Sequence, residues 1–251
     1  LASLDLSRVE AVFADRFGDP GDFVFVLVGD FAPVVAEELA ARYLGTLEGV
    51  AAPAGAAGLR PEPPQGITDR TVTAGSGERG ALLLRFSTTG SWDAAGRAAL
   101  DILEGVVSNR LLAHIREELS ASYSPSVDLE VVVEPVDGVE ATIRVDGDPA
   151  RLDEVLAAVL ADLEDLASAG PRAEELEAAR EQVLSDYEMY DDRSIAEALL
   201  ASALGLGETL LDLITRSQPA AAATAFDIRE AALEVLPLDA YVLIRLVPLG
   251  N

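Results

Sequence analysis

The sequence has no cysteine, no lysine and only one histidine, His114. Without cysteine, the chain can form neither a disulfide nor a thiolate zinc site. With a single histidine, a metal site built from several imidazoles is excluded. The one conventional hydrolytic triad left would pair a serine with His114, and no Gly-x-Ser-x-Gly segment supports it. These absences leave a conventional hydrolytic triad without support in this chain.

Positive charge is also scarce, because 18 basic residues, all arginine, stand against 44 acidic ones, for a formal charge of −26. Such a field repels phosphate backbones and anionic lipids, and no basic run offsets it, so neither nucleic acid nor a membrane surface is an expected partner. The acidic excess is compatible with solubility at high salt, with a preference for basic substrates and with a biased codon usage.

Long apolar stretches are missing as well. The run Phe23–Val28 is far shorter than the roughly 20 residues that a membrane-spanning helix needs, so we expect a soluble protein. The chain begins at Leu1, which indicates processing or an excised piece, and any export signal would lie outside it. The compartment therefore stays open between the cytoplasm, the periplasm and the outside of the cell.

Residues 1–49 predict a helix, a strand and a second helix. The β-branched and aromatic run Phe23–Val28 is bounded by glycine on both sides, which is typical of a strand covered on both faces. Pro33 suits the first turn of the helix that follows, and Gly45 ends it.

Residues 50–66 are rich in Ala, Gly and Pro and show no periodicity, so they predict a linker. Beyond it, residues 67–251 predict one larger domain. Its first elements are two strands, 69–73 and 81–88, followed by a helix for which Ser91 offers an N-cap.

The strongest strand signal is the apolar and polar alternation from Val139 to Val145, which follows the run Val131–Val133 and predicts an antiparallel hairpin with one solvent-exposed face. The strongest helix signal comes next. Asp148 is the expected N-cap, Pro149 opens the helix, and Gly170 ends it. Its apolar stripe comprises Leu152, Val155, Leu156, Val159, Leu160, Leu163 and Leu166.

A second long helix is expected after Pro171, with further helical segments near 193–204, 208–216 and 220–234 before a last strand, Tyr241–Val247. This order, in which helices follow hairpins, predicts an α+β fold with a largely antiparallel sheet and helices packed on one face.

Two segments resemble known motifs, one for zinc binding and one for dinucleotide binding, but the surrounding sequence does not support either site. The segment His114-Ile115-Arg116-Glu117-Glu118 resembles the inverted zincin motif H-x-x-E-H with its last ligand replaced by Glu, but no second histidine completes a site. The glycines of 75–80 have dinucleotide-fingerprint spacing, yet they lie between two predicted strands and open no helix, so they predict a hairpin turn. The sequence therefore predicts no metal site in this chain.

The segment from His114 to Tyr123 has a further likeness. Together with Arg16–Phe31 and Ala41–Leu47, it resembles the insulinase and pitrilysin family of zinc metallopeptidases, the inverzincins, and in particular their bacterial members. The likeness is to the carboxy-terminal half, which holds no zinc, and it covers nearly the whole chain. It implies one half of a clamshell of the LuxS/peptidase-like metalloenzyme fold, with residues 1–49 ending the preceding peptidase domain.

The resemblance also implies a function and a site. Zinc is expected in the missing amino-terminal half, and this chain would enclose and orient peptides for hydrolysis there, being inactive alone. Arg116 and Tyr123 are the implied substrate-binding residues: a guanidinium can hold carbonyls or carboxylates, and a phenol can donate to the oxyanion of the attacked peptide bond.

The expected partners are a peptide substrate and the zinc-bearing half, in the same chain or in another. If residues 1–49 do not hold their structure once cut from the rest of their domain, Phe23–Val28 would add to a neighbour's sheet and give a homodimer as an artefact, because an apolar strand with open edges seeks pairing. The alternative function is a catalytically inactive family member that acts as a scaffold or peptide-binding subunit. A third hypothesis, ranked lower, is an acidic interaction domain unrelated to peptidases.

Overall fold

The computed structural model describes residues 5–23, 25–27, 29–49, 62–75, 78–119, 124–133, 136–188, 196, 200 and 207–249, apart from the side chains of 22, 116–119, 124 and 210. The chain separates into two compact units, residues 1–59 and 60–251. None of the helices within the described ranges is both long and apolar enough to cross a membrane.

The smaller unit consists of two helices, α1 (Leu6–Phe17) and α2 (Pro33–Tyr43), with a 3₁₀ turn, η1 (Pro20–Asp22), between them. Asp5 caps α1 by accepting a hydrogen bond from the Ser7 amide. Neither helix has a buried residue. The unit's large apolar side chains are instead exposed to solvent: Leu6, Val9, Val12, Phe13, Phe17, Phe23, Phe25, Val26, Leu27, Phe31, Val34, Val35, Leu39, Tyr43 and Leu47.

The predicted strand over 23–28 differs from the structure. Phe23 has an extended backbone, with φ −95° and ψ 138°, but neither it nor residues 25–27 belong to a strand. A strand requires a neighbouring chain to complete its ladder of backbone hydrogen bonds. The described part of this unit offers no such neighbour.

The larger unit is built on a five-stranded sheet with the order β1-β5-β2-β4-β3. Three of its four pairings are antiparallel and one, β1 with β5, is parallel. The expected hairpin is confirmed: Val127 pairs with Ile143 and Val131 with Val139. The strands are β1 (Thr68–Thr73), β2 (Gly80–Thr89), β3 (Ser124–Val132), β4 (Gly138–Gly147) and β5 (Val242–Val247).

The expected hairpin turn between the first two strands is wrong, because β1 and β2 are not neighbours. The terminal strand β5 lies between them: Leu243 pairs with Asp69 on one side and with Leu84 on the other. Leu243 is only 2% exposed. A central position covers this apolar strand on both edges, whereas the polar strand β1, exposed along its whole length, takes the edge of the sheet.

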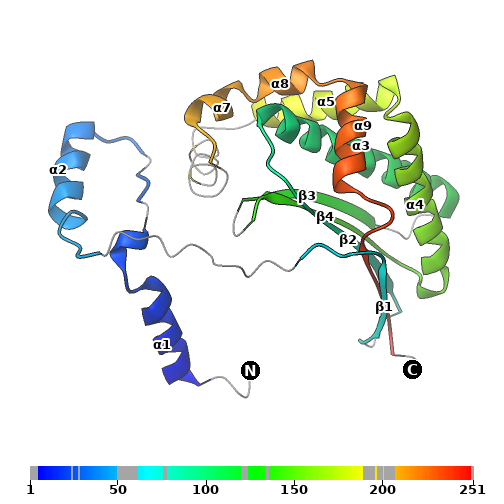
Figure 1. Cartoon of the computed structure of the whole chain (residues 1–251), viewed down its shortest axis with the longest axis horizontal. Helices are drawn as coiled ribbons and strands as arrows, with labels where there is room; N and C mark the ends of the chain where they lie inside the picture. The colour runs from blue at the N-terminus through cyan, green and yellow to red at the C-terminus, as the bar shows by residue number, and fades with distance from the viewer. Residues whose placement is uncertain are drawn as a thin grey trace. The chain divides into compact units, whose positions relative to one another are not determined.

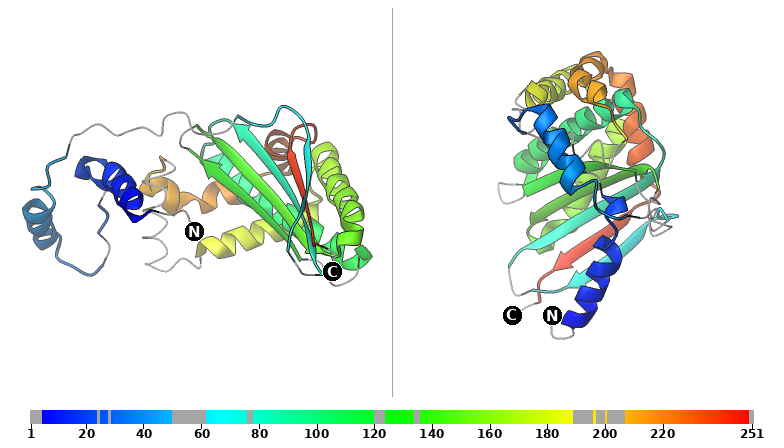
Figure 2. Two further views of the ribbon diagram at one scale, coloured as in Figure 1. Left: turned by 90° about the horizontal axis from the view of Figure 1, so that it is seen from below. Right: turned by 90° about the vertical axis from the view of Figure 1, so that its left-hand side faces the viewer.

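The helices form one layer against one face of the sheet (Figures 1 and 2). This arrangement confirms the predicted α+β class. The helices are α3 (Ala94–Leu119), α4 (Leu152–Ala169), α5 (Ala173–Glu188), α7 (Leu210–Thr215), α8 (Ser217–Ala222) and α9 (Ala225–Val235), with a 3₁₀ turn, η2 (Pro149–Arg151), before α4. Most of the helix expected over 193–204 lies outside the described residues.

The ends of the helices follow local rules. Asp148 caps η2, which leads into α4, by accepting from the Ala150 amide at 2.9 Å, and Gly170 ends α4 with φ +76°. The cap of α3 was predicted wrongly. Asp93, not Ser91, accepts from the amide of Gly96 at 2.9 Å, because the helix begins two residues later than expected.

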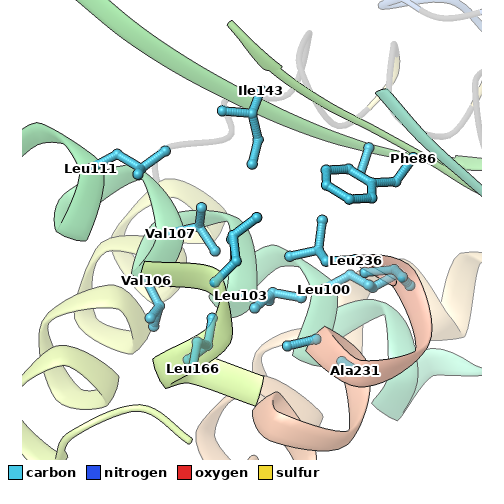
Figure 3. Close-up of a cluster of buried hydrophobic side chains, with 14 of the residues drawn as sticks. Phe86, Leu100, Leu103, Val106, Val107, Leu111, Ile143, Leu166, Ala231 and Leu236 are labelled. Atoms are coloured by element: carbon cyan, nitrogen blue, oxygen red, sulfur yellow. The ribbon is translucent and has the colours of Figure 1, made fainter. Parts of the chain in front are cut away.

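The core lies between the sheet and the helices. Five members of the predicted stripe on α4 are buried, and Leu156 and Leu160 at its margins are half-buried. Figure 3 shows side chains of α3 lying between Phe86 and Ile143 of the sheet on one side and side chains of α4 and α9 on the other. Burying a large aliphatic side chain contributes about 1.5–3 kcal/mol, so this layer contact is the main stabilising feature of the fold.

Candidate substrate-binding site at the end of helix α3

The two predicted site residues flank the connection from α3 to β3. Arg116 lies in the last turn of α3, and its side chain is outside the description; Tyr123 lies wholly outside the described residues. Their role therefore stays a prediction. Both flanks of the connection are described: Ile115 is fully buried, and Ser124 begins β3, paired with Asp146 of β4.

An ion pair lies on β4 beside the first residues of β3. Arg144 donates two hydrogen bonds to Asp146, at 2.9 and 2.7 Å, and these hold the pKa of the Asp146 carboxyl below its ordinary value. Asp146 is paired with Ser124 and Arg144 with Ser126. The ion-paired guanidinium and carboxylate thus lie next to the first residues of β3, the strand that directly follows Tyr123 in the sequence.

This pair faces away from the helices. Its neighbours in the strand, Ile143 and Val145, are fully buried, and successive side chains of a strand point to opposite faces. A second polar group lies on the same face, where Glu140 accepts from Arg85 at 3.0 Å and from Ser87 at 2.6 Å. In the sequence, this surface is indicated by the polar residues that alternate with apolar ones along β4.

The open face changes character across the sheet. On β5, the residues that alternate with buried Leu243 are Val242, Ile244 and Leu246, all half-buried. Leu83 of β2 pairs with Ile244 and is also half-buried. The open face therefore combines an apolar strip over β5 with ion-paired side chains over β4. A surface of this kind can contact both the side chains and the carbonyl groups of a peptide.

The zincin-like segment is described only in part, because the side chains of Glu117 and Glu118 lie outside the described residues. His114 Nδ1 lies 2.9 Å from Asp162 Oδ2, which joins α3 to α4. Across the part of the chain that the structure describes, no three His, Asp or Glu side chains are grouped so that they could hold a metal ion. A zinc site needs at least three protein ligands, so the described residues do not fit zinc.

Sequence reasoning missed the buried charged residue that joins α3 to the two helices after the sheet hairpin, α4 and α5. Arg110 is only 8% exposed. It donates to both carboxylate oxygens of Glu175, at 2.8 and 2.7 Å, to Asp165 at 2.9 Å, and to the carbonyl of Gly170 at 3.4 Å. The guanidinium thereby links α3 to α4, to α5 and to the connection between them. Nothing in the local sequence distinguishes it from a surface arginine.

Comparison with known proteins identifies the family. A family model described as the peptidase M16 inactive domain matches residues 4–183, which is more than half of the chain. The chain therefore belongs to the peptidase M16 family, also called the insulinase family, and the match is to its inactive domain. A search of curated proteins found no match.

Solved structures agree on the fold. The peptidase M16 inactive domain from Pseudomonas fluorescens is 20% identical with a TM-score of 0.78, over 99% of this chain and 59% of its own. A protease from Helicobacter pylori is 15% identical with a TM-score of 0.79, over 98% of this chain and 60% of its own. The periplasmic protease PqqL from Escherichia coli is 20% identical with a TM-score of 0.73, over 88% of this chain and 25% of its own. This chain thus spans less than two thirds of each of these structures.

Proposed function

We propose that this chain is the substrate-binding, zinc-free part of a zinc metalloendopeptidase, which encloses and orients peptides for hydrolysis in a zinc-bearing half. The observation that carries the proposal is the match of residues 4–183 to the peptidase M16 inactive domain. Zinc, when bound in that other half, would supply an activated water for attack on the peptide bond.

In this proposal Arg116 and Tyr123 act on the substrate from the two flanks of the α3–β3 connection. The Arg116 guanidinium holds a carbonyl or carboxylate of the peptide, and the Tyr123 hydroxyl donates to the oxyanion that forms on the attacked carbonyl. The open face of the sheet supports these roles, because Arg144 and Asp146 lie beside the start of β3 and the apolar strip lies on β5.

We further propose that residues 1–49 belong to the domain that precedes this one. The support is their exposed apolar surface, which includes Phe13, Phe17 and Phe23. Isolated helices of 11 and 12 residues without tertiary packing are marginal in water. When the preceding domain is present, Phe23–Val28 would add to its sheet as a strand, and the same apolar run would otherwise drive pairing with a second copy of this chain.

The test is reconstitution with the zinc-bearing half. The two parts are co-purified, and cleavage of a quenched fluorescent peptide is followed at saturating substrate. Arg116→Ala and Tyr123→Phe should each lower kcat about 100-fold or more, the effect of losing one oxyanion donor. Arg151→Ala is the matched control, because its guanidinium pairs with Glu154 on η2 and α4, on the helical side of the domain.

Unchanged turnover in both variants would refute the assignment of the two residues. Peptide binding without cleavage by the reconstituted wild-type protein would favour the alternative function, a catalytically inactive scaffold or peptide-binding subunit.

A further inference from the structure

A groove lies among α3, α8 and α9. It encloses a cavity of about 290 Å³, at the lower end of the roughly 300–1,000 Å³ of pockets for drug-sized ligands, so it has room for one extended side chain. Its apolar lining includes Pro219 and three buried alanines, Ala99, Ala223 and Ala231. The polar lining comes mainly from α9.

One wall of the groove is Trp92, the only tryptophan in the chain. The ring lies directly on the first turn of α3, because a Cβ added to Gly96 would be 2.8 Å from its Cε3 atom. The indole Nε1 is buried and has no hydrogen-bond partner among the described residues. The glycine at position 96 thus lets the aromatic ring serve as a wall of the cavity.

Three carboxylates of α9 line the same cavity, and they are not equivalent. Asp227 accepts hydrogen bonds from the amide and the hydroxyl of Thr224, as part of the capping box at the start of α9. Glu230 accepts a hydrogen bond from the half-buried Arg229 at 2.9 Å. Glu234 makes no hydrogen bond or ion pair with any residue that the structure describes.

The spacing of Glu230 and Glu234 adds a second argument. Residues four apart on a helix are neighbours on its surface, and like charges there repel each other. A cation placed between them would relieve that repulsion. Trp92 also lines the cavity, and the face of an indole ring attracts cations.

We propose that this groove binds an arginine side chain of a polypeptide partner. The aliphatic stem lies against Pro219 and the alanines, and the guanidinium lies against Trp92 and donates to Glu230 and Glu234. Arginine fits better than lysine because its planar fork both stacks on aromatic rings and pairs with carboxylates at two points. The net charge of −26 draws a basic segment toward the surface. The proposal is independent of the peptidase function.

Because the chain has a single tryptophan, the groove carries its own reporter. The full 251-residue chain is titrated with Nα-acetyl-arginine amide while the Trp92 emission is recorded. The matched probe is Nα-acetyl-citrulline amide, which has the same shape without the charge. A saturable change with the arginine compound alone, weakened when NaCl rises from about 50 to about 500 mM, is the expected result.

Two variants locate the binding. Glu230→Gln combined with Glu234→Gln should weaken it at least about 5-fold through loss of the charge-assisted hydrogen bonds. Ala95→Leu should weaken it by filling the groove without changing its charge, since Ala95 lines the cavity and is exposed. Glu174→Gln, on the first turn of α5, removes a surface carboxylate outside the groove; it is the control and should bind as the wild type does.

The proposal is overturned if the two probes change the emission equally, if no saturation is reached, or if the double glutamine variant binds like the Glu174→Gln control. Circular dichroism and the unperturbed emission maximum of each variant establish that it is folded before the titration is interpreted.

Discussion

Replacing Arg110 by alanine tests whether a buried guanidinium holds the helical layer together. The substitution removes the two hydrogen bonds that Arg110 donates to the Glu175 carboxylate and leaves only those from Arg172. The Glu175 side chain is only 17% exposed. It also frees the carbonyl of Gly170 at the end of α4. Removing one partner of a buried ion pair costs about 3–5 kcal/mol. Because Asp165 is half exposed and can be rehydrated, we expect a loss near the lower limit, about 3 kcal/mol.

The assay is equilibrium unfolding in guanidinium chloride at pH 7, followed by the emission of Trp92, which lies in the larger unit and so reports on residues 60–251. For a domain of this size, a loss of about 3 kcal/mol corresponds to a fall in Tm of about 6–12 °C. Arg151→Ala removes an ion pair with the exposed Glu154 and should cost much less than Arg110→Ala, because solvent screens the charges of an exposed pair.

A second arm separates lost charge pairing from lost packing. Arg110→Met combined with Glu175→Leu removes both charges while keeping apolar volume, and it should recover most of the lost stability, since replacing a whole buried pair by apolar residues is often neutral. A cost for Arg110→Ala no larger than that of Arg151→Ala would refute the reasoning, as would a double variant that is no more stable than Arg110→Ala.

The pH dependence of the same pair has a defined sign. Burial raises the pKa of Glu175, but the hydrogen bonds from Arg110 and from the Arg172 amide outweigh it and leave the pKa below its usual value. An acid with a lowered folded pKa contributes stability above its ordinary pKa, which is 4.5 for glutamate, and this contribution is lost as the pH falls through the folded pKa. The stability difference between wild type and Arg110→Ala should therefore narrow below about pH 4.

Two further predictions concern α3. A Cβ added to Gly105 would lie 3.1 Å from Ala179 Cβ on α5. Gly105→Leu should therefore overpack this contact and lower the free energy of unfolding by about 1–3 kcal/mol in the same assay. A stability equal to that of the wild type would contradict the close approach of the two helices. Burial raises the pKa of Glu104, and repulsion from Asp128 and Asp101 raises it further, whereas a hydrogen bond from the Leu129 amide lowers it. Because the net shift is upward, the contribution of Glu104 to stability should fall as the pH rises through the raised pKa. Glu104→Gln should remove that part of the pH–stability curve above the ordinary glutamate pKa of 4.5, and an unchanged curve would contradict the assignment.

Local pattern alone determines much of the fold. The stripe from Leu152 to Leu166, the cap at Asp148 and the stop at Gly170 all follow from side-chain spacing and backbone preference, and each is found in the structure. The hairpin of β3 and β4 follows in the same way, because its strands are joined by a short connection. The family resemblance is likewise readable from the sequence, and the match over residues 4–183 confirms it.

Other features are decided only by tertiary structure. Strand β5 lies between β1 and β2, and its Arg245 donates to Asp69 of β1, a residue 176 positions away in the sequence. No local signal links two segments so far apart, because strand pairing depends on which edges are free and apolar once the rest of the chain has folded.

Burial of a charge is equally non-local: Arg110 and the surface arginines have the same local sequence character, and only the convergence of Glu175, Asp165 and Gly170 makes Arg110 a link between helices. The groove at Trp92 arises in the same way, since α3 and α9 are brought together by the core beneath them. Periodicity determines which face of an element is buried, whereas only the packed chain determines what that face meets.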